Sequence, residues 1–173
     1  MFTQAQGQPN PSMLDVADHL PVLWQRSLRA AEMDLEGARL ATFRNSFQRM
    51  LELTAALHRA GVPLVSGTDG LAGLGLQREL ALYVKAGIPA NEALRIGTWN
   101  GARFAGQSAT RGRIERGYVA DLLLVDGDPT QDIGDLRRAS LVIQGRVAYA
   151  PARLYEAMGY KPFVPDAEWV AQP

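Results

Sequence analysis

Residues 61–70, GVPLVSGTDG, decide how the rest of the chain is interpreted. The apolar run at 62–67 has no polar alternation, and it stops at a turn of small residues that carries one acid, Asp69. Short apolar runs of this kind are typical of strands that are buried on both faces of a parallel sheet between helices. The sequence therefore predicts a strand here, followed by an acid whose role has to be decided.

Two interpretations of Asp69 follow from its position. An Asp that precedes a Gly-rich helix start is a favoured cap, because its carboxylate accepts hydrogen bonds from free backbone N–H groups. An acid at the carboxyl end of a buried parallel strand also stands where α/β sheets and barrels collect ligands and catalytic groups. Ser66, Gly67 and Thr68 are small enough to let a metal or a substrate approach. The spacing alone leaves both interpretations open.

Helices are predicted on both sides of this strand. Apolar side chains recur every three or four residues over 38–60, which indicates an amphipathic helix, and Gly61 is expected to cap it. Further helices are predicted at about 76–86 and 89–97, and one or two more turns are expected to end at Gly106. The middle of the chain thus has the order expected of a βα unit with added helices.

The pattern changes to β after Gly106. Residues 119–125 favour a strand, bounded by Arg116-Gly117 and by the turn DGDP. Residues 141–149 predict a hairpin with Gln144-Gly145 as its two-residue turn. The expected organisation is a flexible tail at 1–12, helices and one strand at 13–106, β-strands at 107–150, and a C-terminal tail with a short helix at 151–173.

Composition excludes several classes of protein. The 173-residue chain is 47% hydrophobic with 18 basic and 18 acidic side chains, so it can form a core but offers no footprint for nucleic acid. There is no cysteine, which excludes disulfides and thiolate chemistry and fits a cytoplasmic location. No apolar stretch approaches the ~18 residues of a membrane span, and the N-terminus lacks the pattern of a secretory signal.

Three stretches, taken in order, resemble the C-terminal end of the amidohydrolase superfamily. They are GVPLVSGTDG, LQRELALYVKAGIPANEALRIGTWNGARFAG and GRIERGYVADLLLVDGDPTQDIGDLRRASLVIQGRVAY, and the similarity covers roughly residues 47 to 150. The nearest branch is imidazolonepropionase-like or prolidase-like. These are metal-dependent hydrolases on a distorted TIM barrel with an accessory β-sandwich. The resemblance implies an α/β fragment: the last βα unit of a TIM-type barrel plus part of an accessory β-sandwich.

The resemblance also assigns a role to Asp69. In that family the matching aspartate ends the eighth barrel strand, binds a divalent metal, usually zinc, and takes a proton from the metal-bound water. Asp69 is therefore expected to be both the catalytic residue and the metal ligand in hydrolysis of a C–N bond, amide or cyclic amide, of a small-molecule substrate. A carboxylate beside a metal-activated water suits that chemistry.

The remaining metal ligands that the family implies are absent. The chain has two histidines and no His-x-His pair. His58 falls on the helix before the predicted strand, which is the wrong element for a ligand, and His19 is expected to be solvated or to sit at a helix entry. Zinc is thus expected only in the complete enzyme, and this chain alone is expected to be inactive. The histidine count also argues against an independent small hydrolase.

Length supports the same conclusion, because a (β/α)₈ barrel takes ~200 residues at the least. The chain is predicted to be the last piece of a larger enzyme, and to form a homo-oligomer or to bind a missing barrel chain. The predicted strand would otherwise lack partners, unless the N-terminal helices shield it. The alternative is a non-catalytic oligomerisation or partner module, in which Asp69 is a vestigial cap.

Three other acids have simpler explanations. Asp121 interrupts the 119–125 run and is predicted to make a structural hydrogen bond. Asp126 and Asp128 flank Gly127 in a turn, and turn geometry accounts for both.

Overall fold

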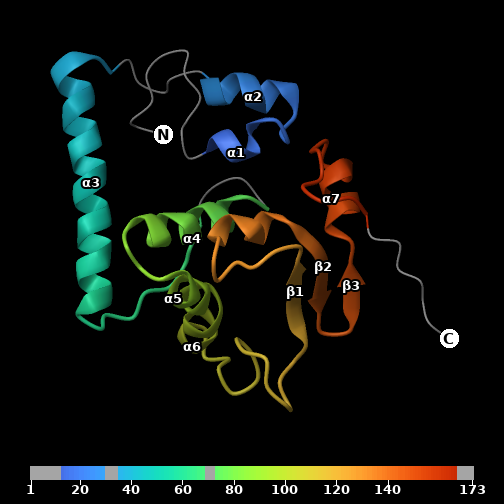
Figure 1. Cartoon of the computed structure of the whole chain (residues 1–173). Helices are drawn as coiled ribbons and strands as arrows, with labels where there is room; N and C mark the ends of the chain where they lie inside the picture. Colours follow the sequence, from blue (N-terminus) through green and yellow to red (C-terminus); the bar gives the residue numbers. More distant parts are fainter. Residues whose placement is uncertain (1–12, 30–34, 69–72, 167–173) are drawn as a thin grey trace.

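A computed structural model of the chain describes residues 13–29, 35–68 and 73–166 (Figure 1). Its elements, in order, are α1 (Leu14–Ala17), α2 (Val22–Arg29), α3 (Gly37–Arg59), α4 (Gly75–Lys85), α5 (Ala90–Arg95), the π-helical turn η2 (Ile96–Asn100), α6 (Gly101–Phe104), β1 (Asp121–Val125), the 3₁₀ turn η3 (Ile133–Arg137), β2 (Ala139–Gln144), β3 (Val147–Tyr149) and α7 (Pro151–Ala157). Among the helices described, none has the length and apolar character needed to cross a bilayer.

The predicted helices are confirmed to within a residue or two. α3 ends at Arg59 and is followed by Gly61 with φ of +73°, a conformation that glycine adopts without steric cost and that commonly ends helices. Pro89 immediately precedes α5, where its lack of an N–H is harmless. η2 and α6 continue this helical segment to the turn at Gly106, as the sequence predicts.

The predicted strand at 62–67 is not formed. The described residues 62–68 join α3 to α4 without β-pairing (Figure 1). The physical reason is that the strands that the structure describes are all paired in a separate antiparallel sheet. A strand needs a neighbour for its backbone groups, and composition alone does not supply one.

That sheet contains β1, β2 and β3 in sequence order, all antiparallel. β1 begins at Asp121 rather than at residue 119, with Asp121 opposite Gln144. The two-residue hairpin loop is Gly145–Arg146, one residue later than predicted, because Gln144 still pairs with Val147. Gly145 has φ of +62°, which suits the first position of a type II′ turn.

The core has two clusters of buried side chains. The first cluster joins three places: α1 with its flanking residues, Leu74 directly before α4, and α7. It contains Met13, Val16, Leu20, Leu74 and Tyr155. The second joins α4 to η3 through Leu80, Ile133 and Leu136. The short helix predicted after residue 150 is present as α7, and its Tyr155 is only 7% exposed, so this part of the C-terminal segment belongs to the core.

Candidate functional site

The loop that contains Asp69 is described only at its two ends. Asp69 itself lies, with residues 70–72, outside the described residues, so its interpretations as a catalytic acid and as a cap stay predictions. The two ends of the loop meet at the start of α4. A Cβ on Gly75 would lie 3.0 Å from the Oγ1 of Thr68 and 3.2 Å from its Cβ. A small residue is therefore needed at position 75 to close the loop.

Two side chains of α4 hold the chain on its way into this loop. The Gly67 N–H donates to the Glu79 carboxylate, 3.1 Å from each oxygen. The Tyr83 hydroxyl lies 3.0 Å from the Val65 carbonyl oxygen and 2.8 Å from Oε1 of Glu79. Positions 79 and 83 lie one above the other on the same face of a helix. α4 thereby positions residues 65–67 directly before Thr68.

The Tyr83 hydroxyl is kept protonated by its surroundings. Burial raises the pKa of Tyr83 above its ordinary value, and the hydrogen bond to Glu79 and the charge of that carboxylate raise it further. A protonated hydroxyl can continue to donate a hydrogen bond, so the contact of Tyr83 on α4 with the Val65 carbonyl persists across the physiological pH range.

A third side chain acts on the same segment from η2. Asn100 donates from Nδ2 to the Leu64 carbonyl oxygen at 2.9 Å. Successive carbonyls of an extended chain point to opposite sides, so Asn100 and Tyr83 satisfy neighbouring carbonyls of the segment. Side chains from α4 and η2 thus take the place that neighbouring strands would have in a sheet. The N-terminal helix α1 packs on Leu74 and Tyr155.

The far end of the loop is attached to α7. The Tyr155 hydroxyl donates to the Gly73 carbonyl oxygen at 3.2 Å, and Leu74 is 2% exposed beneath α1 and α7. Burial raises the pKa of the Tyr155 hydroxyl, which favours the donating form here too. The loop that carries Asp69 is therefore anchored by separate contacts before residue 69 and after residue 72.

His19 lies in the connection that leads into α2, which is the helix-entry position that the sequence predicts as one of its two roles. Its Nδ1 lies 2.9 Å from the Lys161 carbonyl oxygen, and its ring stacks on Phe163 with 3.8 Å between centroids. The Lys161 N–H in turn donates to the His19 carbonyl oxygen at 2.8 Å. His19 thus joins the N-terminal helices to the segment after α7. Sequence spacing gives no signal for a contact between residues so far apart.

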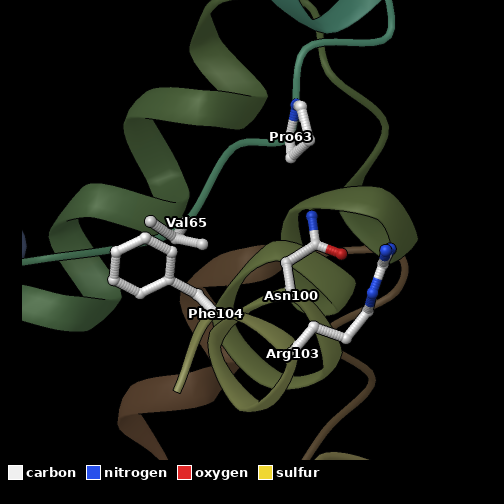
Figure 2. Close-up of a pocket in the computed structure, with 5 residues that line it drawn as sticks. All are labelled: Pro63, Val65, Asn100, Arg103 and Phe104. Carbon is white, nitrogen blue, oxygen red and sulfur yellow. The ribbon is translucent and has the colours of Figure 1, made fainter. Parts of the chain in front are cut away.

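A cavity of about 260 Å³ lies beside the start of the extended segment, and the sequence gives no sign of it. Figure 2 shows its lining: Pro63 and Val65 from the segment, with Asn100, Arg103 and Phe104 from η2 and α6. A neighbouring cavity of about 150 Å³ shares part of this lining and reaches His58 at the end of α3. Among the described residues that line the two cavities, Val65 is the last one before the loop that carries Asp69.

The described residues do not fit a metal centre on their own. They contain no group of three or more His, Cys, Asp or Glu side chains arranged to hold an ion. His58 lies in the last turn of α3, the helix on which the sequence predicts it, where it is half-buried and lines the smaller cavity. Any divalent metal would need donors beyond this part of the chain.

The structural roles predicted for the other acids are confirmed. Asp121 accepts a hydrogen bond from the Gly145 N–H at 3.0 Å, which joins β1 to the hairpin loop. It also forms an ion pair with Arg111. Asp126 pairs with Arg138 at 2.7 Å. Hydrogen bonds from the hydroxyl and the N–H of Thr130 lower the pKa of Asp128 and keep this turn acid ionised.

Comparisons with known proteins agree with the arrangement of these elements. The model of the amidohydrolase family matches residues 45–148. An uncharacterized protein of Mycobacterium tuberculosis is 32% identical over 114 residues, which cover 64% of this chain and 30% of that protein. A 5-methylthioadenosine/S-adenosylhomocysteine deaminase of Aquifex aeolicus is 38% identical over 82 residues, covering 40% of this chain and 19% of the deaminase.

A solved structure gives the same result in three dimensions. A Xaa-Pro dipeptidase with bound methionine matches with a TM-score of 0.53 and 26% identity, over 65% of this chain and 27% of the dipeptidase. The chain thus spans less than a third of the length of each of these three proteins. Because the family model covers more than half of the 173 residues, this chain belongs to the amidohydrolase family.

Proposed function

We propose that this chain forms the C-terminal portion of a metal-dependent hydrolase that cleaves a C–N bond, amide or cyclic amide, of a small molecule. The observation that carries the proposal is the match of residues 45–148 to the amidohydrolase family, which ends well after the anchored loop that contains Asp69. The names dipeptidase and deaminase among the similar proteins denote cleavage of a peptide bond and removal of an amino group, and each of these reactions breaks a C–N bond. This common chemistry supports the reaction class and leaves the substrate open.

The architecture follows from the same proposal. On this proposal, residues 62–106 correspond to the last βα unit of a TIM-type barrel, and β1 to β3 correspond to part of an accessory β-sandwich. The extended segment becomes a paired strand only when neighbouring strands of the barrel are supplied. Its present contacts with Glu79, Tyr83 and Asn100 hold it close to an extended course until then. The cytoplasmic location stays a prediction, based on the absence of cysteine.

Asp69 is the proposed contribution of this chain to the active site. A divalent metal, zinc by resemblance, supplies an activated water in such hydrolases when it is bound. The described residues supply no donor set, and Asp69 is the carboxylate that this chain is proposed to contribute as ligand and proton acceptor. The other donors come from the barrel portion that the proposal requires. The isolated chain is accordingly inactive.

The first experiment is to sequence the DNA immediately upstream of Met1. A reading frame that continues back through a strand with a His-x-His pair supports the proposal. The protein encoded by that longer frame is then expected to hydrolyse amide substrates in a metal-dependent way, with activity lost on chelation. Asp69→Asn should lower kcat/KM by about 10²–10⁴. Asp126→Asn, in an exposed turn, is the matched control and should leave activity unchanged.

A non-catalytic partner module is the second candidate, and one observation favours it. The part of the chain that the structure describes forms two packed clusters and a three-stranded sheet, yet contains no metal-donor cluster. A stop codon just before Met1, no zinc binding by calorimetry, and an effect of Asp69→Asn on stability alone would together establish this candidate. They would overturn the hydrolase proposal.

A further inference from the structure

One face of α3 presents an unusual stripe of exposed apolar side chains. Met50 is 65% exposed, Leu53 59% and Leu57 36%, although Leu51 and Ala55 on a neighbouring face of the same helix are buried. α3 runs along one side of the molecule, with its outer side away from the other elements (Figure 1). Isolated exposed apolar residues are common on proteins, but an aligned row on one helix face indicates a contact surface.

The stripe has the spacing of a helix–helix seam. It contains Phe43, Ser46, Met50, Leu53, Leu57 and Ala60, with alternating intervals of three and four residues. Phe43 is half-buried, whereas Ser46 and Ala60 are exposed. Alternating intervals of three and four keep one row of side chains facing a partner helix that packs at a shallow angle. The row extends over about 27 Å of helix at 1.5 Å per residue.

We propose that this stripe is covered by α3 of a second copy of the chain, packed antiparallel around a two-fold axis. The intervals are symmetric about the point between Leu51 and Glu52, so the stripe can face a reversed copy of itself. Met50 then faces Leu53 of the partner at the centre. Further out, Leu57 faces the small Ser46, and Phe43 faces the small Ala60. Each of these facing pairs combines side chains of complementary volume, as an isologous interface requires.

The charges beside the stripe are also self-complementary. Arg49 and Glu52 lie on the same flank, where they form an exposed ion pair at 2.7 Å within the helix. In the antiparallel register, Arg49 of one copy is displaced by only two residues, about 3 Å, from Glu52 of the other. The two Arg and two Glu side chains of this flank carry no net charge together, so the flank does not repel a second copy. The same surface supplies both the cations and the anions that the contact requires, which favours a second copy over an unrelated partner.

The expected affinity is modest. A seam about 27 Å long between two helices spaced 8–10 Å apart lies at the small end of stable protein interfaces. Dimerisation should accordingly appear over the micromolar range of concentration. This inference uses no residue of the proposed active site, so it stands or falls independently of the hydrolase proposal.

Sedimentation equilibrium of the full chain at rising concentration is the first test, and a monomer–dimer equilibrium is expected. Met50→Lys/Leu53→Lys should give a monomer, because it places four cations at the centre of the seam. The matched control is Leu154→Lys/Met158→Lys, which changes another exposed Leu and Met pair, 51% and 45% exposed, near the end of α7. The control should still dimerise. Circular dichroism establishes that both variants are folded.

Cysteine cross-linking then tests the direction of packing, because the chain has no cysteine of its own. A mixture of Ser46→Cys and Leu57→Cys chains should form a disulfide-linked heterodimer under mild oxidation. Ser46→Cys alone should not cross-link, since its two copies would lie about 16 Å apart along the axis. A wild-type monomer at every concentration, a dimer that persists in the double Lys variant, or efficient cross-linking of Ser46→Cys to itself would each overturn the proposal. A wild-type protein that stays monomeric would indicate that a different polypeptide covers the stripe.

Discussion

The molecule contains two short apolar runs of similar composition, and only one of them is a strand. Residues 121–125 form β1, which pairs along its whole length with β2. Residues 62–67 contain Val62, Leu64 and Val65 together with Pro63 and Gly67, and they have no β-pairing in the structure. The difference is the presence of a partner nearby in the chain. A β-strand is therefore a property of a pair of segments, and an apolar run shows only that a segment is suited to pairing.

The two runs are also held by different kinds of contact. β1 is held by backbone ladder bonds, by the Asp121–Arg111 ion pair and by the turn that follows it. Residues 62–68 are held by the side chains of Glu79, Tyr83 and Asn100. A ladder is cooperative, whereas side-chain contacts are lost one at a time. Changes beside β1 should therefore act on the whole fold, and changes beside 62–68 should act locally.

The largest effect is expected at the turn after β1. Gly127 has φ of +151°, and a Cβ there would lie 2.3–2.8 Å from the carboxyl atoms of Asp135, which accepts the Asp128 N–H. Gly127→Ala should lower the free energy of unfolding by about 3 kcal/mol, from backbone strain and loss of this hydrogen bond. Urea denaturation measures the change.

The matched control separates the clash from the backbone conformation. Gly117 also has a positive φ, +91°, but nothing lies within 4 Å of the position of a Cβ. Gly117→Ala should cost only about 1–2 kcal/mol, from the left-handed conformation alone. Equal losses in the two variants would show that the contact with Asp135 does not stabilise the turn.

A smaller and local effect is expected at the extended segment. Glu79→Gln replaces the charged acceptor of the Gly67 N–H with a neutral one, which should weaken the contact by about 1 kcal/mol. Hydrogen exchange should become about fivefold faster at residues 65–67 and stay unchanged in β2. Glu156→Gln on the exposed side of α7 is the control. Unaltered exchange at 65–67 would show that α4 does not position this segment.

The smallest effect concerns the response to pH. The pKa of the Tyr83 hydroxyl is raised in the folded protein, so the folded state binds this proton more tightly than the unfolded state. The resulting stability is fully present below the unfolded pKa, about 10, and is lost as the pH rises through the folded pKa. The free energy of unfolding of Tyr83→Phe should therefore decline less steeply above pH 10. Parallel curves for the two proteins would contradict this assignment.

Local chemistry made much of the fold predictable. Apolar side chains that recur every three or four positions predicted α3 and α4. Gly61 predicted the end of α3, because few other residue types adopt a positive φ. The hairpin loop was misplaced by one residue, because Gln144-Gly145 and Gly145-Arg146 are both acceptable turn dipeptides and only the pairing of Gln144 with Val147 distinguishes them. The family was predicted from the order of its sequence pieces, and the comparisons confirm it.

The candidate site was predictable only as a position along the chain. Asp69 stands out in the sequence as an acid that follows an apolar run, and its role stays a prediction. The side chains that anchor its loop come from residues 79, 83 and 155, and none of them carries a signal of that role. His19 contacts Lys161 and Phe163 across more than a hundred residues, which no local pattern can predict.

The sequence by itself determined the helices, their glycine ends, the antiparallel hairpin and the family, because these depend on side-chain periodicity and on backbone conformations that few residue types adopt. Tertiary structure alone decided that residues 62–68 remain unpaired, that Tyr83 and Asn100 satisfy their carbonyls, and that the stripe on α3 stays exposed. Pairing and burial are relations between segments. They depend on which partners the chain brings within reach, and that information does not reside in any single stretch of residues.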